Sequence, residues 1–161
     1  MSKILVAYFS ASGVTRKAAE ELARAKNAEL YEILPKTPYI AKDLVWTNPQ
    51  SRSTLEMKDL SCRPEIAGTV KNMPQYDVVF VGFPIWWGRE PSVVDTFLDD
   101  YDFAGKKIVP FCTSGGSGIE DAAKRIQELV GAGATVEAGK RLGGAVSEKD
   151  LETWMAGIDG I

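Results

Sequence analysis

Short hydroxyl side chains surround a single glycine just after the first apolar run of the chain. The segment consists of Ser10, Ala11, Ser12, Gly13, Val14 and Thr15. Such a turn directs backbone N–H groups and the positive end of the next helix dipole toward one point, and the hydroxyls add uncharged donors. The segment therefore predicts a site for a phosphate monoester. Taken alone, it is explained equally well by a helix that uses Ser12 as its N-cap.

Two tryptophans stand in a second loop, which follows the apolar run from Val78 to Phe83. This loop consists of Pro84, Ile85, Trp86, Trp87 and Gly88. Loops run over the surface, where large aromatic side chains usually contact another molecule. The pair therefore predicts a ligand contact, with the alternative that one tryptophan, Trp86 in particular, covers the edge of the sheet.

Glycines dominate a third loop, which follows the apolar run from Lys107 to Cys112. It consists of Thr113, Ser114, Gly115, Gly116, Ser117 and Gly118. A backbone without Cβ atoms lets a flat ligand approach closely, which favours a ligand contact here as well. The alternative is a flexible connection to the next helix.

Strand and helix patterns alternate along the chain. Strands are expected over residues 4–9, 30–34, 78–83, 107–112 and 134–136. Helices are expected after Gly13, with Val14 on its inner face, after Pro91, and after the caps Ser117 and Ser147. This alternation predicts an α/β, three-layer, doubly wound parallel sheet. Ligands of such sheets bind at the carboxyl ends of the strands, where the three loops would lie side by side.

The least regular segment covers residues 35–75 and holds five of the eight prolines. Ser53, with Glu56 three residues later, predicts a capped helix inside it. We expect one domain over residues 1–161, with this segment as an insertion. Long irregular segments are often functional, so we expect it to fold over the sheet edge and bring Trp46 or Arg52 near the ligand. A surface excursion anchored by Trp46 is an equal alternative.

Composition excludes several classes of function. A formal net charge of −3 without a basic run argues against nucleic-acid binding. The sequence has no signal peptide, and no apolar stretch approaches the ~20 residues of a membrane span, so a cytoplasmic protein that binds no membrane is expected. The absence of histidine excludes Ser-His-Asp and Cys-His catalysis and most transition-metal sites. Cys62 and Cys112 are predicted to be reduced thiols, with Cys112 in the core.

The three loops together resemble those of the flavodoxin-like family, and the resemblance runs nearly end to end. It implies a five-stranded sheet in the order 2-1-3-4-5 that holds FMN. By this resemblance Ser10 to Thr15 hold the phosphate, Trp87 stacks on the flavin, Gly88 offers its carbonyl to flavin N5, and the loop from Thr113 to Gly118 lies beside the pyrimidine edge. The third loop lacks the tyrosine of many flavodoxins and is similar instead to that of flavin quinone reductases.

Two functions remain open from the sequence. The first, preferred because no nicotinamide-binding segment is recognisable, is an electron carrier that docks a redox partner protein. The second is an NAD(P)H-dependent reductase of quinones or another small-molecule acceptor. For the oligomeric state, a monomer or a homodimer is expected. A receiver-type signalling domain is disfavoured, because it needs acidic residues at strand ends where Ser10 and Phe83 stand. Acidic residues after the tryptophan loop predict a docking face, or merely a solvated helix face; they are Glu90, Asp95, Asp99, Asp100 and Asp102.

Overall fold

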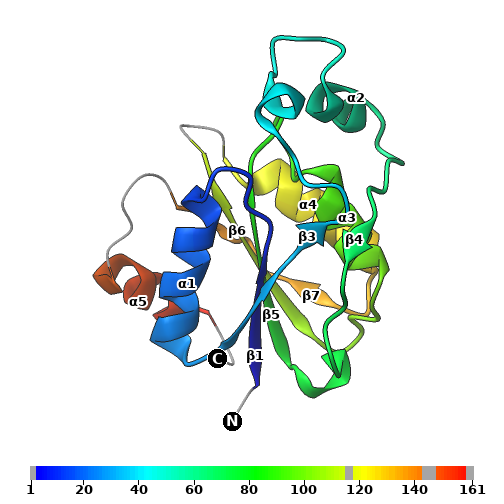
Figure 1. The fold of residues 1–161 in the computed structure, drawn as a ribbon. Helices are drawn as coiled ribbons and strands as arrows, with labels where there is room; N and C mark the ends of the chain where they lie inside the picture. Colours follow the sequence, from blue (N-terminus) through cyan, green and yellow to red (C-terminus); the bar gives the residue numbers. More distant parts are fainter. Residues whose placement is uncertain (1–2, 115–117, 143–147, 159–161) are drawn as a thin grey trace.

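A parallel sheet forms the centre of the fold, with helices on both faces (Figure 1). The structure is a computed structural model that describes residues 3–114, 118–142 and 148–158. The strands lie in the order β2-β1-β5-β6-β7, which confirms the predicted fold and strand order. Their bounds are β1 Ile4–Tyr8, β2 Glu29–Glu32, β5 Val78–Pro84, β6 Lys107–Thr113 and β7 Thr135–Val136.

Two apolar layers enclose the sheet. Helices α1 (Val14–Lys26) and α5 (Glu148–Ala156) cover one face, where Val6, Leu22 and Leu151 are buried. Helices α3 (Ser92–Asp99) and α4 (Glu120–Val130) cover the other face. Because side chains alternate along a strand, the unbroken apolar runs of β1 and β5 supply buried residues to both layers.

Several element boundaries differ from the prediction. The second strand ends at Glu32 instead of continuing to Leu34; Ile33 then donates its N–H to the carbonyl of Tyr8 at 2.7 Å. Val14, expected on the inner face of α1, is 52% exposed, because the buried side of the helix starts at Thr15. Helix α4 follows Ile119 without a side-chain cap, and the predicted caps Ser117 and Ser147 lie outside the described residues.

The outer strand on the β6 side is divided in two. β7 pairs with the start of β6, and β8 (Lys140–Arg141), which was not predicted, pairs with its end. Toward this side β6 presents the carbonyls of Ile108 and Cys112, which accept from the outer chain at 2.9 and 2.7 Å. Pro110 lies between Ile108 and Cys112 on the same side of β6. It has no N–H to donate, so the pairing is interrupted there.

The insertion rises beyond the carboxyl ends of the strands (Figure 1). A small antiparallel sheet of β3 (Leu34–Pro35) and β4 (Ile66–Ala67) joins its ends. Between them lie the 3-10 helix η1 (Ala41–Leu44) and helix α2 (Arg52–Lys58); a second 3-10 helix, η2 (Met73–Gln75), precedes β5. The cap of α2 is Ser51, whose hydroxyl accepts the N–H of Thr54, and not the predicted Ser53.

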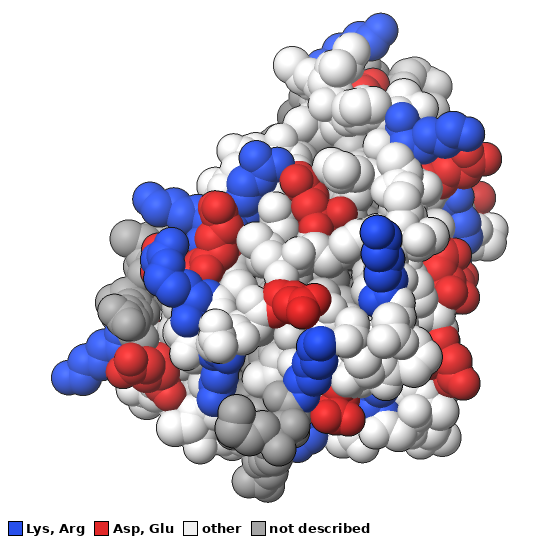
Figure 2. Space-filling model, turned by 60° about the horizontal axis from the view of Figure 1, so that its bottom comes forward, with Lys and Arg blue, Asp and Glu red and all other residues white. Residues whose placement is uncertain are grey.

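Acidic and basic side chains alternate on the face that carries the amino ends of the strands (Figure 2). Lys3 and Glu29 form one such pair there at 3.7 Å, both about half exposed. Exposed pairs of this kind contribute little to stability. Over the described part of the chain, no helix combines the length and the apolar character needed to cross a membrane.

Candidate functional site

Direct hydrogen bonds join the three predicted loops at the carboxyl edge of the sheet. Phe9, the residue directly after β1, donates its N–H to the Gly82 carbonyl at 2.9 Å, and Ile85 donates its N–H to the Thr113 carbonyl at 3.2 Å. The hydroxyls of Thr15 and Thr113, which are 98 residues apart in sequence, lie 2.7 Å from each other. The structure therefore brings the hydroxyl, tryptophan and glycine loops together.

The hydroxyl loop leaves the start of α1 free to bind an anion. Gly13 has a φ of +92° and precedes a helix of 13 residues with no side-chain cap and no acidic residue in its first turn. Ser10 accepts the Gly13 N–H at 3.0 Å and shapes the turn, while Ser12 is exposed. Ser12 is therefore not the helix cap. Uncapped N–H groups and free hydroxyls can donate to the oxygens of a doubly charged terminal phosphate.

The members of the hydroxyl loop are not equally placed for such an anion. Ala11 is half-buried, and Val14 lies exposed on the outer side of the first turn. Thr15 is only 2% exposed, and its hydroxyl already has Thr113 as a partner. The geometry gives Thr15 a role in joining two loops, and its role at the phosphate stays a prediction.

The two tryptophans occupy different positions in a tight turn. Trp86 and Arg89 exchange backbone hydrogen bonds at 2.9 and 3.1 Å, so Trp87 and Gly88 are the two central residues. Their φ angles are +50° and +79°, the pattern of a type I′ turn. Glycine reaches such angles without steric cost, whereas tryptophan does not. A large aromatic residue held there is a reason to look for a function.

Trp86 faces the protein and Trp87 faces outward. Trp86 makes edge-to-face contacts with Phe9 and Tyr39, with ring centroids 5.6 and 5.4 Å apart. Trp87 is 49% exposed. Trp86 thus packs against the protein as expected while also lining a cavity that it shares with Trp87, and Trp87 is the more exposed of the two.

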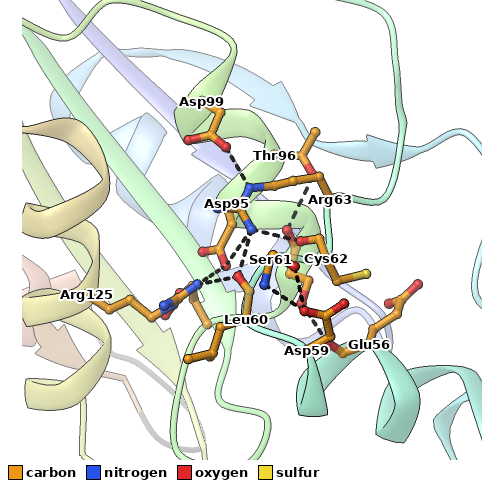
Figure 3. A network of polar contacts seen from close by, with 12 residues as sticks. Glu56, Asp59, Leu60, Ser61, Cys62, Arg63, Asp95, Thr96, Asp99 and Arg125 are labelled. Atoms are coloured by element: carbon orange, nitrogen blue, oxygen red, sulfur yellow. Dashed lines mark hydrogen bonds and ion pairs between the residues drawn. The ribbon is translucent and has the colours of Figure 1, made fainter.

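Buried ionic groups hold the base of this turn. Arg89 donates to the Met57 carbonyl and to Asp95, and Arg125 of α4 donates to Glu90 at 3.0 Å and to Asp95 at 2.8 Å. Figure 3 shows Arg125 and Arg63 converging on Asp95 from opposite sides. Glu90 and Asp95 are fully buried, so the predicted acidic docking face is wrong for both. Asp99 and Asp100 remain exposed.

The buried carboxyl pair carries less negative charge than its sequence suggests. Burial, together with the nearby carboxylate of Asp95, raises the pKa of Glu90 far above its ordinary value. One oxygen of Glu90 and one of Asp95 have no hydrogen-bond partner among the described residues. The raised pKa favours the protonated form of Glu90, and a proton there lowers the repulsion between the two carboxyl groups.

The glycine loop is described only at its two ends. Thr113 is buried, and the Ser114 carbonyl accepts from the guanidinium of Arg141 at 3.1 Å. Gly118 is exposed, and Gly115 and Gly116 lie outside the described residues. Arg141 on β8 was not foreseen as part of this region, because the strand that carries it was not predicted.

A cavity of about 450 Å³ opens between the insertion and the tryptophan turn. Its wall includes Leu44, Trp46 and Ser53 from the insertion, Ile85 and Trp87 from the turn, and Ser12 from the hydroxyl loop. Pro84, at the end of β5, also lines it. Trp46 therefore lies in the wall of this cavity, and its expected approach to the ligand stays a prediction. Arg52 instead stacks on Tyr39 at 3.8 Å and pairs with Glu56 at 3.0 Å.

Comparisons with known proteins agree on one family. The family described as Flavodoxin matches residues 3–158. A candidate flavoprotein of Bacteroides eggerthii is 41% identical, with a TM-score of 0.90 and 97% of each chain covered. One from Bacteroides uniformis is 41% identical, with a TM-score of 0.91, covering 96% of this chain and 98% of that chain.

A more distant structure contains a ligand. A flavoprotein of Lactobacillus acidophilus in complex with FMN is 23% identical, with a TM-score of 0.75, covering 96% of this chain and 99% of that chain. Among the curated proteins, none matches this sequence.

Proposed function

This chain belongs to the flavodoxin family, and from that premise we propose that it holds one FMN at the carboxyl edge of its sheet and carries electrons through it. The observation that carries the proposal is the uncapped start of α1 behind Gly13, joined to the third loop by the Thr15–Thr113 hydroxyl contact. FMN, when bound, accepts and releases electrons one or two at a time. The protein supplies the position and the electrostatic environment.

Each loop has a distinct part in this proposal. The segment from Ser10 to Thr15 binds the phosphate through its N–H groups and hydroxyls. Trp87 covers one face of the flavin ring, and Gly88 turns its carbonyl toward N5 with the conformational freedom of a glycine at φ +79°. The third loop is expected to approach the ring through Thr113, Ser114, Gly115, Gly116 and Gly118. The tryptophan turn is supported by Pro84, Ile85 and Trp86.

Selectivity for FMN is the first experiment. Apoprotein titrated with FMN, FAD and riboflavin should bind FMN best, at one per chain. Riboflavin should bind more weakly because it lacks the phosphate, and FAD because its phosphate is esterified to an adenosine moiety for which no binding element is recognisable. Equal affinity for FMN and riboflavin would show that the hydroxyl loop does not hold the phosphate.

A reductase of a small acceptor is the second candidate, and the cavity beside Trp87 favours it. Rapid mixing of the FMN-loaded protein with NADPH and NADH under anaerobic conditions separates the two functions. A carrier should react slowly with both nucleotides and should show two separate one-electron waves in a potentiometric titration. Fast bleaching of the flavin and a single two-electron wave would instead support the reductase.

A further inference from the structure

The phenol of Tyr39 lies between a tryptophan of the proposed FMN site and a carboxylate of helix α2. Its ring makes an edge-to-face contact with Trp86, with ring centroids 5.4 Å apart, and Trp86 lines the cavity beside the turn. At the other end of the same side chain, the hydroxyl donates a hydrogen bond to Oε1 of Glu56. Tyr39 thus joins an aromatic ring of the site to a proton acceptor in the insertion.

Arg52 holds both partners of this hydrogen bond. Its Nε donates to Oε2 of Glu56 at 3.0 Å, and its guanidinium carbon lies 3.8 Å from the centre of the Tyr39 ring. The ion pair presents Glu56 as a carboxylate, which is the form that takes up a proton. A cation over an aromatic ring opposes a further positive charge in that ring. Loss of an electron from Tyr39 is therefore coupled to loss of its proton.

The phenol of Tyr39 is protonated before any such event. Burial, together with the hydrogen bond to Glu56, raises the pKa of Tyr39 well above its ordinary value. Two further titratable groups face this cluster: Asp43, which lies 3.9 Å from Arg52, and the thiol of Cys62. The phenolic proton itself is directed at Glu56, which gives it a defined destination.

A second tyrosine makes the same kind of hydrogen bond in a different setting. Tyr76 donates to Glu29 at the amino end of the strands, and Lys3 lies 5.7 Å from the centre of its ring. The ring contacts of Trp86 within the described part of the chain are with Tyr39 and Phe9. Tyr76 therefore has the carboxylate and the nearby cation but lacks the tryptophan, which makes it a matched control.

We propose that Trp86, Tyr39 and Glu56 form a relay that restores Trp86 after a one-electron oxidation at the site. The oxidant is a light-excited flavin or an oxidising radical, which takes one electron from the Trp86 indole. One electron then passes from Tyr39 to the Trp86 radical cation, while the O–H bond of Tyr39 breaks and its proton moves to Glu56. The products are neutral Trp86, a neutral tyrosyl radical and a protonated Glu56. The relay rests on the proposed function only for the flavin as oxidant.

Pulse radiolysis of the FMN-free protein tests the relay without any flavin. Azide radicals oxidise tryptophan, and part of the tryptophanyl absorbance of the wild type should then convert to tyrosyl absorbance at a rate independent of protein concentration. Tyr39→Phe and Trp86→Phe should remove this conversion, whereas Tyr76→Phe should leave it unchanged. Glu56→Gln should slow it about 100-fold or more, as expected when a positioned proton acceptor is lost.

The wild type also provides a test that requires no substitution. Because the electron moves together with an exchangeable proton, the conversion should be slower in D2O than in H2O. Equal rates in the two solvents would overturn the proposal, as would an unchanged conversion in Tyr39→Phe or in Glu56→Gln. Urea denaturation of each variant shows whether a loss of the conversion reflects unfolding, in which case the solvent comparison in the wild type decides.

Laser-flash excitation of the FMN-loaded protein tests the flavin as the oxidant. A tyrosyl radical should appear in the wild type and in Tyr76→Phe, whereas the radical of Tyr39→Phe should stay on tryptophan. A tyrosyl radical of equal yield in Tyr39→Phe would overturn the proposal for the flavin. Failure of FMN to bind the wild type would instead count against the proposed function, because the radiolysis experiment does not depend on FMN.

Discussion

Substitutions of Trp87 can distinguish two effects of this side chain: its contact with FMN and the backbone strain that it causes in the turn. The side chain is 49% exposed, and a fully buried aromatic side chain covers about 150–250 Å². A flavin that covers the remaining half would bury roughly 100 Å², worth about 2–3 kcal/mol at ~25 cal/mol per Å². Trp87→Ala should therefore weaken FMN binding about 30- to 150-fold.

A second substitution at the same position tests the turn. Trp87→Asn creates Asn-Gly, the pair preferred in type I′ turns, because asparagine tolerates positive φ better than alanine. Both variants lose the same ring contact and should bind FMN equally weakly. In the apoprotein, however, Trp87→Asn should be more stable than Trp87→Ala by about 1 kcal/mol.

Fluorescence titration with FMN and urea denaturation of the apoprotein measure the two effects. The fluorescence of bound flavin should be strongly quenched in the wild type and should recover in both Trp87 variants. Trp86→Ala should behave in the opposite way, losing apoprotein stability because it removes contacts with Phe9 and Tyr39. Wild-type FMN affinity in Trp87→Ala, combined with lost affinity and unchanged stability in Trp86→Ala, would refute this division of roles.

Three further predictions concern the phosphate and the buried charges. Ser12→Ala should weaken FMN binding by about 1–3 kcal/mol in titrations while riboflavin affinity stays constant. Arg125→Met removes a hydrogen-bond partner from both Glu90 and Asp95 and should lower the unfolding free energy by about 3–5 kcal/mol. As a control, Arg24→Met at an exposed position should lower it by less than about 1 kcal/mol. The pKa of Glu90 is raised in the folded protein, so the folded chain holds a proton that the unfolded chain releases above about pH 5. The unfolding free energy of the wild type should therefore fall relative to that of Glu90→Gln as the pH rises from about 5. The slope is at most about 1.4 kcal/mol per pH unit. Parallel pH profiles for these two proteins would contradict the raised pKa of Glu90.

Long apolar runs made the centre of the fold predictable. β1, β5 and β6 are buried on both faces, and their loops had to meet at one edge of a parallel sheet. The two-residue strands β3, β4 and β8 were missed, because a segment of two residues has no periodicity. Val14 was misplaced because the sequence does not fix where a helix begins to face the core.

The residues that support the site were less visible than the loops themselves. Glu90 and Asp95 look like surface residues in sequence, and only the fold brings Arg125 from α4 between them. Ser51 and Ser53 are both suitable caps for α2, and the pairing of Ser53 with Glu56 pointed to the wrong one. That error concealed the feature that makes Ser53 unusual, a buried hydroxyl that has no hydrogen-bond partner within the described part of the chain.

The divided outer strand bears on how copies of this protein meet one another. A long exposed edge would offer a row of free N–H and C=O groups to a neighbouring chain and invite aggregation. Here β7 and β8 have two residues each and are separated where Pro110 stops the pairing, while the opposite edge, β2, carries Glu29 and Glu32. Neither side of the sheet is a good template for edge-to-edge growth, so a concentrated solution of the folded protein should resist fibre formation.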